Sequence, residues 1–328
     1  MAGRTMRAVQ YSRYGGGAAS LEHVEIPVPS PKKDEVLLKV EAVAINPVDW
    51  KIQNGVMRPI LPSKFPFAPG TDVAGEIVEV GPGVDGFNPG DKVVSGLSLG
   101  KAGGFAEFAA APANTTVQRP PEVAAAEAAC LPIAAVTALQ ALKHIATKFD
   151  GTGEAANVLV TAASGGVGTY AVQLAKLANL HVTATCGGRN IDLVKSLGAD
   201  EVLDYKTPEG NSLKSPSGRK YDLVVHCTTG IAWSSFEPNL AAHGKVIHLT
   251  PGAGSIVQYA FKMLTFSKKK LVPLLASVNR EDLKFLVDLV KEGKLRTVVD
   301  SRYELSKAEE AWAKSMEGHA TGKIILEV

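Results

Sequence analysis

The chain has 328 residues, of which 45% are hydrophobic and 21% charged, a balance typical of a globular protein with enough apolar side chains for two domains. Lysine and arginine total 35 against 33 acidic residues, and this formal charge of +2, without a basic block, argues against nucleic acid as a partner. The three cysteines, Cys130, Cys186 and Cys227, are widely spaced, which indicates a reducing compartment. No uninterrupted apolar run reaches the roughly 18 to 20 residues that span a bilayer, so no membrane crossing is expected.

Short β-prone segments separated by glycine and proline dominate the chain up to about residue 122. This part is therefore predicted to be all β, with strands at 7–11, 35–45, 72–80, 91–95 and 105–110. Arg4, Arg7 and Arg13 precede the first acidic residue, as in a transit peptide. Because a strand is predicted to begin within this stretch, we expect it to be folded and not cleaved.

Strands and helices alternate after residue 157, following an alanine-rich helix predicted at 124–145. Such alternation with apolar strands predicts a doubly wound parallel sheet. The last part is predicted to hold helices at 280–292 and 306–316 and strands at 297–300 and 323–328, which would join the N-terminal sheet. The expected domains are 1–125 with 276–328, and 126–275.

A glycine-rich turn follows the predicted strand 157–161 and precedes a predicted helix. Glycines there let backbone N–H groups approach a pyrophosphate, and the helix N-terminus adds partial positive charge. A tight turn in any α/β protein is the alternative, but strand, glycines and helix occur in the order that a dinucleotide site requires. The residues of this turn are Ser164, Gly165, Gly166, Val167 and Gly168.

The next predicted strand ends without the Asp or Glu that usually holds the ribose 2′-hydroxyl of NAD. Cys186, Gly187, Gly188, Arg189 and Asn190 stand there instead. A guanidinium pairs well with phosphate oxygens, so this tip favours NADPH as the cofactor. The alternative is that Arg189 is a solvated surface residue.

Several motifs together resemble the medium-chain dehydrogenase/reductase superfamily, specifically its quinone oxidoreductase branch. The resemblance covers essentially the whole chain, and it implies an α/β protein with a GroES-like β-rich catalytic domain and a Rossmann cofactor domain. Plant chloroplast members of this branch are especially similar, which implies a location at the chloroplast envelope periphery without a cleaved transit peptide, and otherwise the cytoplasm. The motifs are 46–49, 70–75, 90–93, 162–168, 197–200 and 322–324.

Zinc-dependent members of this superfamily carry a cysteine in the segment that is 46–49 here, and a His-Glu pair where this chain has Thr71 and Asp72. No cysteine precedes Cys130, and zinc needs several thiolate or imidazole ligands. A site with no metal is therefore predicted.

The resemblance also implies roles for individual residues. Asn46 and Asp49 would line the catalytic cleft, Lys51 would reach a cofactor phosphate or ribose, and Thr137 would lie near the nicotinamide. From the residues alone, Asn46 and Asp49 could instead begin and cap a helical turn, and Tyr205 could be core packing. The remaining implied cofactor contacts are the turn 164–168, the tip 187–190 with Tyr205, the strand ends Thr229, Gly230, Thr250 and Pro251, and the tail residues Thr321, Gly322 and Lys323.

The activity implied is reduction of the conjugated double bond of α,β-unsaturated carbonyls, such as lipid-derived enones and ketols, or of quinones, with NADPH as hydride donor. Asp49 would ordinarily be ionised, so solvent is the expected proton source. A non-catalytic nucleotide-sensing or RNA-binding member of the family is the alternative. The chain is expected to be a monomer or homodimer, and the apolar segment 256–266 before Lys268 to Lys270 suggests either peripheral membrane contact or an interface helix.

Overall fold

The structure is a computed structural model that describes residues 3–62, 64–146, 148–250 and 268–328. The chain divides into two compact units, one formed by 1–136 with 278–328 and the other by 137–277. The first boundary thus lies later than the predicted one at residue 125, because α2 (Ala125–Ala128) packs on strands of the first unit. The second boundary lies close to the predicted residue 276.

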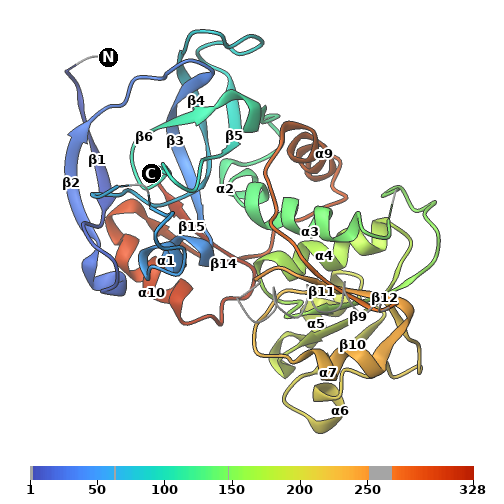
Figure 1. Cartoon of the computed structure of the whole chain (residues 1–328). Helices are drawn as coiled ribbons and strands as arrows, with labels where there is room; N and C mark the ends of the chain where they lie inside the picture. Colours follow the sequence, from blue (N-terminus) through green and yellow to red (C-terminus); the bar gives the residue numbers. More distant parts are fainter. Residues whose placement is uncertain (1–2, 63, 147, 251–267) are drawn as a thin grey trace. The chain divides into compact units, whose positions relative to one another are not determined.

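The first unit is built on a seven-stranded sheet with the order β14-β15-β3-β4-β5-β7, in which β6 also pairs with β3 (Figure 1). A separate antiparallel pair joins β1 and β2. The strands are β1 (Thr5–Gln10), β2 (Glu22–Pro27), β3 (Glu35–Ile45), β4 (Asp72–Val80), β5 (Lys92–Gly96), β6 (Phe108–Pro112), β7 (Thr116–Gln118), β14 (Val299–Glu304) and β15 (Lys323–Glu327).

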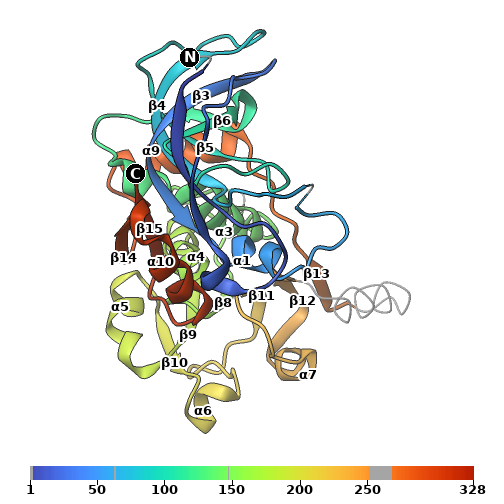
Figure 2. The same ribbon diagram turned by 90° about the vertical axis from the view of Figure 1, so that its left-hand side faces the viewer.

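The tail joins this sheet, as predicted: β15 pairs antiparallel with β3, and β14 pairs parallel with β15. Its helices are α9 (Arg280–Lys291) and α10 (Ala308–Met316), and α10 lies against β14 and β15 in both views (Figures 1 and 2). Trp312 of α10 is fully buried, and its indole N–H donates to Oε1 of Gln53 at 3.1 Å. Because Gln53 ends α1 (Pro47–Gln53), this bond connects the tail to the segment that carries the predicted catalytic residues.

The second unit is a six-stranded parallel sheet with the order β10-β9-β8-β11-β12-β13, which confirms the Rossmann-type prediction. Strand order reverses between β8 and β11, and ligands of such sheets bind at the carboxyl ends of the strands beside this switch point. The elements are α3 (Val136–Leu142), β8 (Asn157–Thr161), α4 (Gly166–Leu177), β9 (His181–Cys186), α5 (Ile191–Ser196), β10 (Glu201–Asp204), α6 (Pro208–Asn211), β11 (Tyr221–His226), α7 (Trp233–Phe236), β12 (Leu240–His248) and β13 (Lys270–Pro273).

The alanine-rich segment is not the single regular helix that the sequence predicted. A π-helical turn, Leu131–Ala135, separates α2 from α3, and Pro132 lies at its start, where a missing N–H is tolerated. By length and composition the stretch Ala125–Leu142 could cross a membrane, contrary to the expectation from uninterrupted runs. Because 78% of it is buried, a core helix accounts for its apolar composition.

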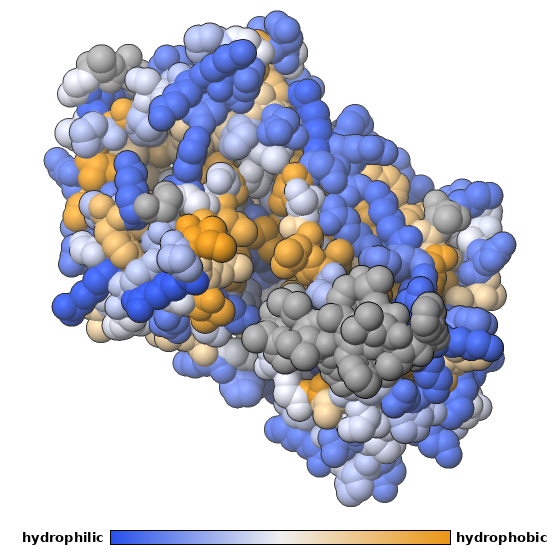
Figure 3. Space-filling model, viewed as in Figure 1, coloured by the Kyte–Doolittle hydropathy of each residue, from blue (hydrophilic) through white to orange (hydrophobic). Residues whose placement is uncertain are grey.

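Hydrophilic residues cover most of the described surface on the face seen in Figure 3, and hydrophobic residues occur there in scattered groups. Exposed large hydrophobic side chains include Val56, Ile60, Tyr205 and Leu275. The apolar segment 256–266, for which membrane contact was considered, lies outside the described residues.

Candidate functional site

The glycine-rich turn of the second unit has the geometry of a phosphate cradle. Gly165 is the N-cap of α4 and makes no side-chain cap hydrogen bond, so the first N–H groups of this helix remain open to an anion. A Cβ at Gly168 would lie 2.3 Å from the carbonyl oxygen of Ala162, so only glycine permits this close approach of helix and strand. These features fit the pyrophosphate of a dinucleotide.

The tip of β9 combines two predicted residues and one acid that the sequence analysis missed. A Cβ at Gly187 would lie 3.6 Å from the hydroxyl of Tyr205, which brings these two positions together as predicted, and Arg189 is exposed beside them. A Cβ at Gly188 would lie 2.8 Å from Oδ2 of Asp204. The tip is thus not free of carboxylates, because β10 supplies one that is absent from the segment 186–190.

The other predicted residues of the second unit that the structure describes lie at the beginning of α3 or after strands β11 and β12. Thr137 is buried at the beginning of α3, and Thr229 and Gly230 follow β11, with Gly230 in the left-handed region at φ 84°. Thr250 donates from its hydroxyl to the carbonyl of Thr228 at 3.4 Å, a bond that joins the segments following β11 and β12. Pro251 lies outside the described residues.

A buried polar cluster in the first unit contains both predicted catalytic residues, and Asn46 is at its centre. The side-chain amide of Asn46 donates to Oδ2 of Asp72 at 2.9 Å and to the carbonyl of Ala44 at 3.3 Å. Its Oδ1 accepts from Nζ of Lys323 at 2.6 Å. Both amide hydrogens are therefore used within the protein, so Asn46 holds its neighbours in place and has none to spare for a substrate oxygen.

Lys323 is the cation of this cluster and is only 3% exposed. Its ammonium donates to Oδ1 of Asn46 and, at 3.3 Å, to the carbonyl of Ile45. An ammonium has three hydrogens, and the described residues provide no acceptor for the third. The residue that the resemblance assigned to the cofactor is therefore a buried donor with one hydrogen left for an incoming acceptor.

Asp72 was not among the predicted site residues. It is fully buried at the start of β4, and its Oδ2 also accepts from the backbone N–H of Ile133 at 3.1 Å. Within the described part of the chain, Oδ1 has no partner. Burial raises the pKa of Asp72 to about 6, against the opposing effects of Lys323 and Asn46. An acid directly before the apolar run Val73, Ala74 and Gly75 was the sequence signal that could have identified it.

Asp49 combines the two interpretations that the sequence left open. It is the third residue of α1, and its Oδ2 accepts from the backbone N–H of Asn46 at 2.8 Å, so it does cap this helix. Burial raises its pKa to about 7, and Asp72 adds to the rise while the Asn46 N–H and Lys323 oppose it. Burial therefore favours the protonated form of Asp49 and works against the expectation that this carboxyl is simply ionised.

The remaining predicted residues of the first unit have mixed roles. Lys51 lies on α1 with its ammonium 5.7 Å from the Trp50 ring centroid, and burial lowers its pKa. The backbone N–H of Thr321 donates to Oδ1 of Asp300 at 2.7 Å. Gly322 has φ 90°, and a Cβ there would lie 2.1 Å from the carbonyl of Val298, so glycine is required to place Lys323 correctly.

A metal centre was not expected, and the structure provides no positive sign of one. Among the described residues, no group of three or more His, Cys, Asp and Glu side chains is arranged to hold a metal ion. Independence from zinc remains a prediction.

Comparison with known proteins gives the family. Residues 32–121 match the family described as alcohol dehydrogenase GroES-like domain, and residues 197–326 match the family described as zinc-binding dehydrogenase. The chloroplast envelope quinone oxidoreductase homolog of Arabidopsis thaliana is 67% identical over 328 residues, covering all of both chains. The chain belongs to the quinone oxidoreductase branch of the medium-chain dehydrogenase/reductase superfamily. It is an oxidoreductase, and full-length relatives at 62–67% identity are chloroplast proteins, which supports the same location for this member.

Two further similarities extend across the whole fold. The NADPH-dependent alkenal/one oxidoreductase of Arabidopsis thaliana chloroplasts is 32% identical, over 98% of this chain and 80% of its own. The solved quinone oxidoreductase of Coxiella burnetii is 31% identical and has a TM-score of 0.89, covering 99% of this chain and all of its own. Together with the Rossmann-type sheet, these relatives support a nicotinamide cofactor for this quinone oxidoreductase family member.

Proposed function

We propose that this oxidoreductase uses NADPH to reduce an electron-poor acceptor, either the conjugated double bond of an α,β-unsaturated carbonyl or a quinone, without a metal ion. The observation that carries the proposal is the buried ammonium of Lys323. It donates to Asn46 and to the carbonyl of Ile45, and its third hydrogen has no acceptor among the described residues. Both acceptor classes develop negative charge on oxygen after hydride addition. A desolvated, preorganised cation stabilises such an oxyanion without Lewis-acid help.

The cofactor, when bound, supplies the hydride. The start of α4 would hold its pyrophosphate, and Arg189 with Tyr205 would face the adenosine 2′-phosphate. Asp204 beside Gly188 works against a second negative charge at this tip. NADPH is favoured over NADH here because the attraction between the 2′-phosphate and the Arg189 guanidinium exceeds the repulsion by the Asp204 carboxylate.

The cluster also offers a proton source of its own. With its pKa raised to about 7, Asp49 is partly protonated at neutral pH, and Asp72 adds a second carboxyl with a raised pKa. A carboxyl group whose pKa lies near the operating pH is suited to general acid catalysis. We therefore assign protonation of the reduced acceptor to this cluster in preference to solvent.

Exposed apolar residues that follow α1 in the chain would suit a hydrophobic acceptor. Val56 and Ile60, in the segment that follows α1, are 68% and 76% exposed. Contiguous exposed apolar patches commonly mark a contact surface for an apolar ligand, and we propose that these two side chains contribute to one. A lipid-derived enone or a quinone with an apolar tail has the matching chemistry.

The test is NADPH oxidation with a long-chain enone and with a simple quinone, each repeated with NADH and with a chelator present. We expect turnover with NADPH that the chelator leaves unchanged. Arg189→Asp should reduce the NADPH-over-NADH preference by roughly ten- to a hundredfold, as the loss of a charge-assisted phosphate contact predicts.

An unchanged cofactor preference in Arg189→Asp would refute the role given to that guanidinium, and loss of turnover with the chelator would refute the metal-free mechanism. If every electrophile fails to oxidise NADPH although the cofactor binds tightly, the chain is a nucleotide sensor and not an enzyme.

A further inference from the structure

The carboxyl group of Asp72 receives two hydrogen bonds from separate segments of the chain, and both end on the same oxygen. The side-chain amide of Asn46 donates to Oδ2 at 2.9 Å, and the backbone N–H of Ile133 donates to it at 3.1 Å. A carboxyl oxygen has two lone pairs, so these two bonds occupy both of them. A proton carried by Asp72 must therefore lie on Oδ1.

An irregular helical turn supplies the second of these donors. Ile133 is the third residue of the π-helical turn Leu131–Ala135. At the end of this turn, the backbone N–H of Val136 donates to the carbonyl of Leu131 in the wide i→i+5 pattern of a π-helix. Such turns are rare and occur frequently at functional sites. Here the turn fixes the orientation of the Asp72 carboxyl through the main chain.

The other oxygen of Asp72, Oδ1, is left without a partner. Asp72 is fully buried, and among the described residues Oδ1 is the only carboxylate oxygen that is buried and makes no hydrogen bond. The neighbouring acid Asp49 differs, because its carboxyl group accepts from the backbone N–H groups of Asn46 and Gly70. A protonated Oδ1 is thus a buried donor whose acceptor is absent from the described part of the chain. Since buried donors are nearly always paired, we expect an incoming group to provide that acceptor.

The charged groups around Asp72 allow it to hold a proton and to release it. Burial raises the pKa of Asp72 to about 6, while Lys323 of β15 and the Asn46 amide lower it. The other titratable groups that interact electrostatically with it are Asp49 of α1 and the thiol of Cys130. Burial raises the pKa of this thiol to about 12, so it stays neutral. A carboxyl group with such a raised pKa can serve as a general acid near neutral pH.

We propose that Asp72 is the general acid of the reduction and that it gives its proton to the reduced acceptor from Oδ1. This inference rests on the proposed function. The Asn46 amide that donates to Asp72 also accepts from the ammonium of Lys323, so the buried acid and the buried cation are hydrogen-bonded to one amide group. An acceptor oxygen that binds the remaining hydrogen of Lys323 is therefore brought toward the acid.

The step balances with an enone as the acceptor. Hydride addition forms a C–H bond at the β-carbon, and the π electrons move to oxygen, which gives an enolate beside Lys323. The O–H bond at Oδ1 then breaks, and its electron pair stays on the Asp72 carboxylate. The released proton forms a C–H bond at the α-carbon while the carbonyl is restored. One proton from water regenerates the acid before the next turnover.

Asp72→Asn tests this assignment, because an amide is nearly isosteric with the protonated acid. Its oxygen can accept from Asn46 and Ile133 as Oδ2 does, and its NH₂ group replaces Oδ1–H without a proton that can be transferred. We expect kcat with a long-chain enone to fall about a hundredfold at pH 6, with the KM for the enone little changed, as the loss of a general acid predicts. Asp49→Asn is the matched control and should lower kcat much less.

The configuration of the product separates a proton donor from a residue with a structural role only. With an enone that carries a methyl group on its α-carbon, a fixed acid protonates one face, so the wild type should give a single configuration. Protonation by solvent in Asp72→Asn should give both configurations. The wild-type kcat/KM should also fall as the pH rises through about 6, because only the protonated acid is active, and Asp72→Asn should lack this decline.

Wild-type kcat in Asp72→Asn would overturn the proposal, and so would a lower kcat that leaves the single configuration intact. Loss of stereocontrol in Asp49→Asn alone would assign the proton to the other acid. If Asp72→Asn fails to fold, the wild type still decides, since mixed product configurations would contradict a fixed acid. Wild-type protein that oxidises NADPH with no electrophile would refute the proposed function itself, a result distinct from unchanged catalysis in Asp72→Asn.

Discussion

Two of the carboxylates of strand β4 lie in opposite environments. Asp72, at its start, is fully buried, and burial raises its pKa to about 6. Glu76, farther along, is solvated and accepts from the ammonium of Lys92 at 2.8 Å, which lowers its pKa. Both acids have a lysine within the same sheet, yet the shifts have opposite signs. The difference shows that desolvation sets the sign of the pKa shift in the core, whereas pairing with a lysine sets it at the surface.

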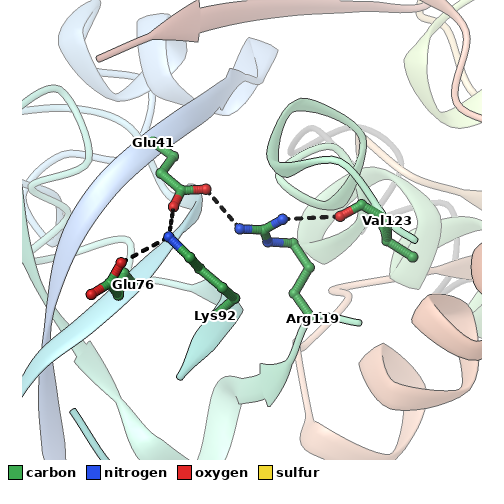
Figure 4. Close-up of polar contacts among 5 residues, drawn as sticks. All are labelled: Glu41, Glu76, Lys92, Arg119 and Val123. Atoms are coloured by element: carbon green, nitrogen blue, oxygen red, sulfur yellow. Dashed lines mark hydrogen bonds and ion pairs between the residues drawn. The ribbon is translucent and has the colours of Figure 1, made fainter. Parts of the chain in front are cut away.

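The surface acids belong to an ion network that Figure 4 shows in detail. The ammonium of Lys92 lies between Glu41 and Glu76, and the guanidinium of Arg119 donates to Oε2 of Glu41 at 2.6 Å and to the carbonyl of Val123 at 3.0 Å. The Lys92 side chain is 45% exposed. Solvent can replace the two carboxylate partners of Lys92, whereas the residues of the cluster around Asn46 are almost fully buried.

Removing the two lysines in turn should give the largest contrast. Lys323→Met leaves Asp72, Asp49 and the Asn46 carbonyl without their cation, and we expect it to lower the free energy of unfolding by about 3 to 5 kcal/mol. Lys92→Met, the matched control, should lower it by about 1 kcal/mol or less. Urea denaturation at pH 7.5 measures both. Equal losses would show that the two clusters do not differ in solvation as the structure indicates.

The pH dependence of stability should separate the two acids next. The pKa of Asp72 is higher in the folded state than its ordinary value of 3.8, so between about pH 4 and pH 6 the folded protein holds the extra proton. Its contribution is therefore present at low pH and is lost as the pH rises through about 6.

Asp72→Asn removes this titration. The free energy of unfolding of wild type minus that of the variant should fall by about 3 kcal/mol between pH 4 and pH 7. Glu76→Gln is the control, and its difference should change in the opposite direction, because the lowered pKa of Glu76 stabilises the fold only where that acid is ionised. A flat difference for Asp72→Asn would contradict a buried, titrating carboxyl.

Salt should give the smallest effect. Raising NaCl from 0.05 to 1 M shortens the screening length from above 10 Å to about 3 Å, which weakens exposed ion pairs. The stability gap between wild type and Lys92→Met should then shrink by a few tenths of a kcal/mol, while the gap for Lys323→Met stays constant. A salt-sensitive Lys323→Met gap would show that water enters the buried cluster.

Sequence periodicity was sufficient for the fold, because the apolar alternation of the β-rich part and the strand-helix order of the cofactor unit depend on near neighbours. The glycine turn was likewise local. Contacts between residues far apart in the sequence could not be predicted from this local periodicity. Asp204 comes beside Gly188 from the next strand, and Lys323 reaches Asn46 from the far end of the chain. The raised pKa of Asp49 also depends on burial, which the sequence around it does not reveal.

The pairing of β15 with β3 has a consequence for the nascent chain during translation. β3 offers residues 42–45 to β15, yet the ribosome makes the entire 137–277 unit before Ile324 and its neighbours emerge. Until then residues 42–45 of β3 lack their partner strand on one side, and unpaired strand edges promote misfolding and aggregation. Translation therefore completes the buried cluster of Asn46 and Lys323 last, and a chaperone that shields this edge would act during that interval.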